Sequence, residues 1–130
     1  MDWLLNQGKT DSSNTGPHVD HTLGTDEGVY IYLESSYPAS NGDKAILSSE
    51  YLDKTTSMGC FSLWYFMHGK DVGAMSVYLN DSLTAPRLLA GINGEQGANW
   101  QKLEMEIKHP SEFRLYIEGM VSSNASSYEL

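Results

Sequence analysis

The stretch of sequence that decides the fold is Cys60-Phe61-Ser62-Leu63-Trp64-Tyr65-Phe66-Met67-His68-Gly69. Alternate side chains of a strand point to opposite faces of its sheet, so Phe61, Leu63, Tyr65 and Met67 share one face, opposite Ser62, Trp64, Phe66 and His68. Both faces carry large apolar groups, which predicts a strand in the middle of a sheet that is covered on both sides. Gly69 and Gly73 then favour a turn into a second strand at 74–79, so we expect a hairpin with a cysteine at its entrance.

Alternation of apolar and polar residues also marks segments 29–33, 103–107 and 113–118, and more weakly 44–47. Turn-forming pairs such as Asn41-Gly42, Asn93-Gly94 and His109-Pro110 separate these segments. No window keeps the three- and four-residue spacing of a helix. The pattern predicts an all-β antiparallel sandwich with less than about a tenth of its residues in helices.

Length and charge limit the classes of partner. A chain of 130 residues is typical of one domain, and 8 basic against 17 acidic residues leave a net charge of −9. This acidity argues against binding to nucleic acid or to anionic membranes, and no apolar run is long enough to insert into a bilayer. The start of the chain has no basic, apolar secretory signal. On the count of one cysteine, the chain would be assigned to a reducing compartment, with Cys60 either a small buried apolar residue or a reactive thiol.

Six motifs along the chain resemble, in order, those of the MAM domain, an extracellular adhesion module of meprins, neuropilins and receptor tyrosine phosphatases. The motifs are Thr15-Gly16-Pro17 with Asp20-His21-Thr22, the segment 28–34, the segment 42–49, the segment 60–79, a GxQGxxW-like turn at 94–100 and the strand at 113–121. The first of these is the most specific. The resemblance covers residues 2–121 and implies a jelly-roll-like antiparallel β-sandwich.

The same resemblance implies two strands that this sequence lacks. A MAM domain opens with a CxFE-type strand and closes with a GxIAIDDI-type strand, and three of the four family cysteines are not found here. Cys60 resembles the third family cysteine, whose disulfide partner lies beyond the closing strand. We therefore expect a truncated domain, either a fragment, an incomplete gene model or a short variant, followed by a flexible tail at 122–130.

Residues 6–28 form a long polar segment without a regular pattern, which is typical of a loop that is functional, disordered or held by an ion. Oxygen ligands suit a hard cation, so Asp20, with Asp26 second, is the candidate site for a structural calcium or sodium ion, as in some MAM domains. The alternative is that Asp20 caps its own turn. His18 and His21 are either a metal pair or two residues of a polar loop. Asn80 and Asn124 begin glycosylation sequons if the chain is secreted.

No motif supports an enzyme. There is no GxSxG nucleophile, and nothing in the sequence joins Cys60 to a histidine as a catalytic dyad. The prediction is a non-catalytic extracellular adhesion or recognition module without a cofactor beyond such an ion. It would make homophilic or heterophilic protein contacts through loops and an exposed sheet face. The alternative is a carbohydrate-binding jelly roll, which requires Trp3, Trp64 and Trp100 to form an exposed platform rather than to pack internally.

Overall fold

The computed structural model describes residues 1–11, 15–34, 39–55, 57–70 and 72–122, and these contain β-strands and no helix. The strands are β1 (Leu4–Gln7), β2 (Val29–Tyr32), β3 (Lys44–Ser48), β4 (Gly59–Tyr65), β5 (Ala74–Asn80), β6 (Arg87–Asn93), β7 (Gln101–Ile107) and β8 (Arg114–Met120). All their pairings are antiparallel. The predicted all-β class is confirmed.

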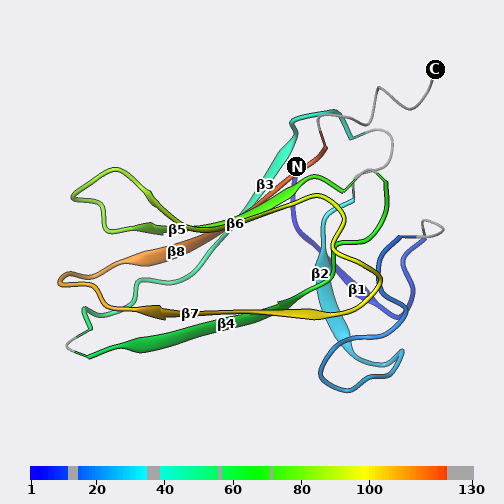
Figure 1. Cartoon of the computed structure of the whole chain (residues 1–130), viewed down its shortest axis with the longest axis horizontal. Helices are drawn as coiled ribbons and strands as arrows, with labels where there is room; N and C mark the ends of the chain where they lie inside the picture. Colours follow the sequence, from blue (N-terminus) through cyan, green and yellow to red (C-terminus); the bar gives the residue numbers. More distant parts are fainter. Residues whose placement is uncertain (12–14, 35–38, 56, 71, 123–130) are drawn as a thin grey trace.

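The strands form two layers. One layer is a four-stranded sheet in the order β3-β8-β5-β6, and the facing layer contains the pair β4-β7 (Figure 1). A third unit, the two-stranded ribbon β1-β2, lies at one end of the molecule, at the right of Figure 1. This arrangement is consistent with the predicted jelly-roll-like sandwich.

The hydrophobic core fills the space between the two layers. Its buried cluster comprises Leu79, Ile107, Phe113 and Leu115, against which Phe61 and Met105 of the β4-β7 pair are packed. In β5 the odd-numbered residues are buried and the even-numbered residues are half-buried, and Val77 has no exposed surface. The alternation seen in the sequence therefore separates the inner from the outer face of each sheet.

Five of the predicted strands, in segments 29–33, 44–47, 74–79, 103–107 and 113–118, correspond to β2, β3, β5, β7 and β8. Two strands were missed. β1 has only four residues, too few to show a period. β6 contains Leu88-Leu89-Ala90, where a bulge opposite Val77 and Tyr78 shifts the register and breaks the alternation.

The prediction that the 60–69 strand lies in the middle of a sheet is wrong for the described residues. β4 pairs with β7 alone, and its odd-numbered residues face the core while Cys60, Ser62 and Trp64 are exposed. The predicted hairpin is also wrong, because β5 pairs with β6 and β8 in the opposite sheet. The connection between β4 and β5 therefore crosses from one layer to the other. Strong apolar character on both faces of a strand does not distinguish a central strand from one whose outer face is covered in part by a loop.

The described residues end at Val121 and Ser122, which are both buried, and the predicted domain boundary after Val121 stays a prediction. Val121 still exchanges backbone hydrogen bonds with the β3 side, through the amide of Gly42 and the carbonyl of Asp43, and Ser122 is buried. The rest of the predicted tail, residues 123–130, lies outside the described residues. Among the described residues, no helix is present that is long and apolar enough to cross a membrane.

Candidate functional site

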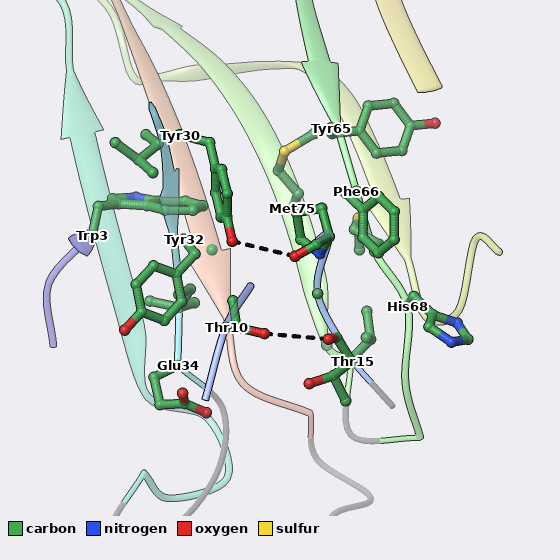
Figure 2. A pocket seen from close by; sticks show the side chains of 18 of the residues that line it. Trp3, Thr10, Thr15, Tyr30, Tyr32, Glu34, Tyr65, Phe66, His68 and Met75 are labelled. Atoms are coloured by element: carbon green, nitrogen blue, oxygen red, sulfur yellow. Dashed lines mark hydrogen bonds between the residues drawn. The ribbon is translucent and has the colours of Figure 1, made fainter. Parts of the chain in front are cut away.

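A cleft of about 390 Å³ opens between the β1-β2 ribbon, β4 and the four-stranded sheet. Figure 2 shows Trp3, Tyr30 and Tyr32 on one side of it, Tyr65, Phe66 and His68 on the other, and Met75 between them. Its lining is mainly aromatic and aliphatic, and its volume is within the usual range for ligand sites. Most of the motifs that mark the sequence contribute residues to this cleft or to the structures around it.

Tyr30 fixes the start of the long loop that follows β1. Its hydroxyl donates to the carbonyl of Gly8 at 2.6 Å and accepts from the side-chain amide of Asn6 at 2.7 Å. It also lies 3.4 Å from the carbonyl of Pro17, a contact drawn in Figure 2. A phenol with these partners is satisfied in a half-buried site and joins the start and the middle of the loop to β2.

The segment Thr15-Gly16-Pro17 is shaped by steric limits. Gly16 has φ of +65°, and a Cβ there would lie 2.6 Å from Oγ1 of Thr10. That hydroxyl donates to the carbonyl of Thr15 at 3.3 Å. Glycine is therefore required both by backbone conformation and by space, which is the physical basis of this motif.

Asp20 closes the next turn. Its carboxylate accepts hydrogen bonds from the amide of Leu23 at 2.8 Å and of Thr25 at 3.3 Å. The bond from Leu23 contributes most to holding the pKa of Asp20 below its ordinary value. A Cβ on Gly28 would lie 2.0 Å from the Asp20 carboxyl carbon, so Gly28 provides the space for this buried side chain.

His21 connects the loop to an aromatic cluster. Its imidazole is stacked on Trp64, with ring centroids 3.7 Å apart, and makes an edge contact with Trp100. Trp100 also contacts the rings of Tyr30 and Phe66 edge-on, and its indole N–H donates to the carbonyl of Val19 at 3.0 Å. The loop is thus held by side-chain packing and hydrogen bonds.

The predicted cation site is not assembled by the described side chains. Both carboxylate oxygens of Asp20 accept backbone amides, Asp26 is exposed, and no group of three His, Cys, Asp or Glu residues in the described ranges is arranged to hold a metal. His18 is exposed, whereas His21 packs against tryptophan. The geometry fits the capping alternative for Asp20, and ion binding stays a prediction.

Cys60 is exposed, so the expectation that it is a small buried residue is wrong. It lies opposite Glu106 on the outer face of the β4-β7 pair. It is four residues from Trp64, or about 13 Å along a strand, so His21 lies far from its thiol. The structure therefore brings no histidine of this cluster to Cys60. The disulfide that the family resemblance implies stays a prediction.

Asn80, the first predicted glycosylation site, ends β5. Its side-chain amide donates to the hydroxyl of Tyr116 at 3.0 Å, and its oxygen accepts from the amide of Ser82. A glycan on this nitrogen would compete with the bond to Tyr116. Asn124, the second site, lies outside the described residues. Glycosylation at both positions stays a prediction.

The three tryptophans do not form a common platform. Trp64 is 44% exposed, but His21 covers one face of its indole. Trp3 and Trp100 are half-buried and line the cleft. A sugar-stacking surface needs coplanar exposed rings, so this geometry disfavours the carbohydrate-binding alternative.

A buried polar cluster was missed by sequence reasoning. The carboxylate of Asp81 contacts Nε2 of His109 at 2.9 Å and accepts from the amide and hydroxyl of Thr84. The Thr84 amide and then His109 hold the pKa of Asp81 far below its ordinary value. Thr55 bonds the backbone of His109, so the cluster joins three loops at one end of the sandwich. Asp81 and His109 are 28 residues apart, and no local motif links them.

The outer face of the four-stranded sheet carries a second surface. One row across the strands is Ser48, Tyr116, Tyr78 and Leu88, and the next row is Ile46, Glu118, Ser76 and Gly91. Ile46 is 60% and Leu88 56% exposed, and a Cβ on Gly91 would meet no atom within 4 Å. We call these eight residues the outer sheet face. It is open, broad and mixed in polarity.

Comparisons with known proteins give one consistent result. The family model described as MAM domain, meprin/A5/mu, matches residues 1–129. MAM domain-containing glycosylphosphatidylinositol anchor protein 1 of Gallus gallus is 33% identical over 99% of this chain, which spans 14% of that protein.

Two other relatives are similar to the chain over most of its length. MAM domain-containing glycosylphosphatidylinositol anchor protein 2 of Rattus norvegicus is 34% identical over 82% of the chain. Thyroid hormone-induced protein B of Xenopus laevis is 32% identical over 91% of the chain. This chain spans 12% and 17% of their lengths, respectively, so it is similar to a small part of each.

Proposed function

Because this chain belongs to the MAM domain family, we propose that it is an extracellular module of a cell-surface protein, and that it acts by contact with other proteins. The names of two relatives, which describe glycosylphosphatidylinositol anchor proteins, support the cell-surface location. Membership in the family supports a role in recognition rather than catalysis.

The observation that carries the contact role is the outer sheet face. Tyr78 and Tyr116 lie side by side at its centre, and the exposed Ile46 and Leu88 flank them on the two edge strands. Tyrosine is enriched in protein interfaces because it offers apolar area together with a polar hydroxyl. Exposed apolar side chains gathered on one sheet face, with polar neighbours, mark an interaction surface more often than scattered ones do.

Two lysine substitutions in one variant, Ile46→Lys and Leu88→Lys, test the role of this face. The protein is biotinylated, attached to streptavidin beads and mixed either with identical beads or with a panel of live cells. We expect bead aggregation if contacts are homophilic, or bead binding to cells if they are heterophilic. The double variant should reduce the signal at least about tenfold, because it replaces the two exposed apolar side chains that flank the tyrosines and places charges in an interface that excludes water.

The matched control carries Leu83→Lys and Met58→Lys, which add the same charge at exposed apolar positions outside this face. The control should bind as the wild type does. Treatment of the cells with protease should abolish binding, whereas treatment with glycosidases should not. Binding that is sensitive only to glycosidases would instead support the carbohydrate alternative, and equal loss in both double variants would remove the outer sheet face from the contact.

A further inference from the structure

Arg114 differs from the other basic residues of the chain in its burial. The six lysines and Arg87 are exposed, whereas Arg114, the first residue of β8, is half-buried. Among the described residues no carboxylate forms an ion pair with its guanidinium, and its Nε–H is buried without a hydrogen-bond partner. A charge that is partly withdrawn from water is usually paired with an opposite charge, and this arginine has no such counterion in the described chain.

The guanidinium of Arg114 is held by its neighbours. Its Cζ lies 4.0 Å from the ring centroid of Tyr51, which is 53% exposed. The hydroxyl of Tyr116 interacts with the same guanidinium and accepts from the side-chain amide of Asn80 at 3.0 Å. The bond from Asn80 and then the contact with Arg114 hold the pKa of Tyr116 below its ordinary value. A planar cation fixed over an aromatic ring loses little further freedom when it binds an anion.

Arg114 lies at one end of the outer sheet face. It is two residues from Tyr116 along β8 and directly opposite Asn80 on β5, so its side chain projects from the same face as Tyr78. Two residues of a strand span about 6.7 Å, so one partner surface can reach both Arg114 and the tyrosines. β8 and β5 are the two central strands of their sheet and are paired on both sides. The position of Arg114 therefore does not depend on an unpaired strand edge.

We propose that Arg114 binds a carboxylate of a partner protein, whose apolar neighbours pack on Tyr78 and Leu88 of the outer sheet face. The terminal N–H groups of the guanidinium, which lie beyond its buried Nε, are the donors to the carboxylate oxygens. Charge complementarity carries this assignment, because the partner supplies the counterion that the described chain does not. Arginine and tyrosine are also among the residues that most often dominate the energy of a protein interface.

The surroundings of Arg114 favour a single carboxylate over a polyanion such as a sulfated polysaccharide. Polyanions are bound by clusters of basic residues. Lys44, at the other end of the face, is paired with Glu118 at 3.7 Å, and the chain has a net charge of −9. One guanidinium beside tyrosine and apolar side chains matches one acidic residue of a protein surface.

This inference rests on the proposed function and adds the chemistry of the partner. Its first test uses two blocked peptides, acetyl-Leu-Glu-Leu-amide and acetyl-Leu-Gln-Leu-amide, which are titrated into the ¹⁵N-labelled chain and followed by NMR. The chain has two arginines, so Arg87 provides an exposed control in the same spectrum, and Arg87→Lys assigns the two Nε–H resonances.

We expect the glutamate peptide to shift the Arg114 resonance saturably, with a Kd of about 1–10 mM. The glutamine peptide should bind at least about fivefold more weakly, because it has no charge to pair with the guanidinium. The Arg87 resonance should not move with either peptide.

The second test connects the site with a whole partner in the bead assay. Arg114→Gln should reduce the signal at least about tenfold, whereas Arg87→Gln, which removes the same charge from an exposed position, should leave it unchanged. Arg114→Lys keeps the charge without the planar group and should retain part of the binding. Circular dichroism verifies the fold of each variant. If Arg114→Gln does not fold, the peptide titrations of the wild type decide.

Three results would overturn the inference. The first is an Arg114 resonance that does not shift saturably or shifts equally with both peptides. The second is undiminished bead binding by folded Arg114→Gln. The third is inhibition of bead binding by soluble heparin that is lost in Arg114→Gln, which would assign the guanidinium to a sulfated polysaccharide. The double variant of Ile46 and Leu88 tests the proposed function separately, and the peptide titration needs no partner, so the two failures are distinguishable.

Discussion

The imidazole of His21 lies flat on the indole of Trp64, with ring centroids 3.7 Å apart and an interplanar angle of 15°. The two residues are far apart in the sequence, one in the loop between β1 and β2 and the other on the outer face of β4. Their contact holds this loop against the β4-β7 pair. It also covers one face of a tryptophan that would otherwise be open to water.

This contact should be measurable as a coupling energy. In a double-mutant cycle with His21→Ala and Trp64→Ala, we expect a coupling of about 0.5–1.5 kcal/mol in the free energy of unfolding, the usual value for an aromatic pair. The matched cycle uses His18→Ala with Trp64→Ala, since His18 is exposed. Chemical denaturation measures both cycles. A coupling near zero for His21 would show that the stacking does not contribute to stability.

The buried pair of Asp81 and His109 should make stability fall in acid. Because the pKa of Asp81 is lower in the folded chain than its ordinary value of 3.8, its contribution to stability is present above that value and is lost as the pH falls below it. We expect Asp81→Asn to be less stable than the wild type at neutral pH and to lose less further stability in acid.

Thermal melts from pH 7 to pH 2 test this expectation, with Asp53→Asn as the control at an exposed position. If the melting temperatures of the wild type and of Asp81→Asn fell by the same amount across the acidic range, this expectation would be contradicted.

Asp20 should stabilise its turn without a metal ion, because backbone amides already occupy both carboxylate oxygens. We expect Asp20→Ala to lower the melting temperature by the same amount in EDTA and in calcium. Asp26→Ala, at an exposed position, should have little effect in either buffer. If Asp20→Ala lowered the melting temperature more in calcium than in EDTA, the result would instead establish a cation site at this residue.

Phe113 should be a major contributor to stability. It is 3% exposed, belongs to the buried cluster and contacts the ring of His109 edge-on. Phe113→Ala removes a buried aromatic ring and leaves a cavity, so we expect a loss of about 3–5 kcal/mol. Leu88→Ala, at a 56% exposed position, should cost less than about 0.5 kcal/mol. Urea denaturation compares the two, and similar losses would be inconsistent with the core assigned here.

Cys60 should react as an accessible thiol. Because it is the only cysteine and is exposed, we expect the native protein to release about one equivalent of thionitrobenzoate from Ellman's reagent. We also expect it to form disulfide-linked dimers in oxidising buffer. Cys60→Ser should abolish the dimers without changing the melting temperature. A native thiol that reacts only after denaturation would show that Cys60 is protected.

The alternation of residues determined the class of the fold and the positions of most strands. Phe61, Leu63 and Tyr65 do share one face of β4 as predicted, because a two-residue period directly specifies which side chains share a face. The resemblance of motifs such as Thr15-Gly16-Pro17 to the MAM pattern was also sufficient to identify the family. Local steric requirements such as the positive φ of Gly16 are fixed by a few neighbouring residues and are therefore visible in sequence.

The tertiary structure alone decided how the strands are paired and which polar residues meet. β4 and β5 are consecutive in the chain and yet belong to opposite layers. The choice of pairing partner depends on long-range packing, which a period of two does not encode. The same holds for Asp81 with His109 and for His21 with Trp64, whose contacts join distant segments. The exposure of Cys60 follows from its place on the outer face of the β4-β7 pair, which the arrangement of the layers decides. These features depend on the whole fold, so no local pattern of residues specifies them.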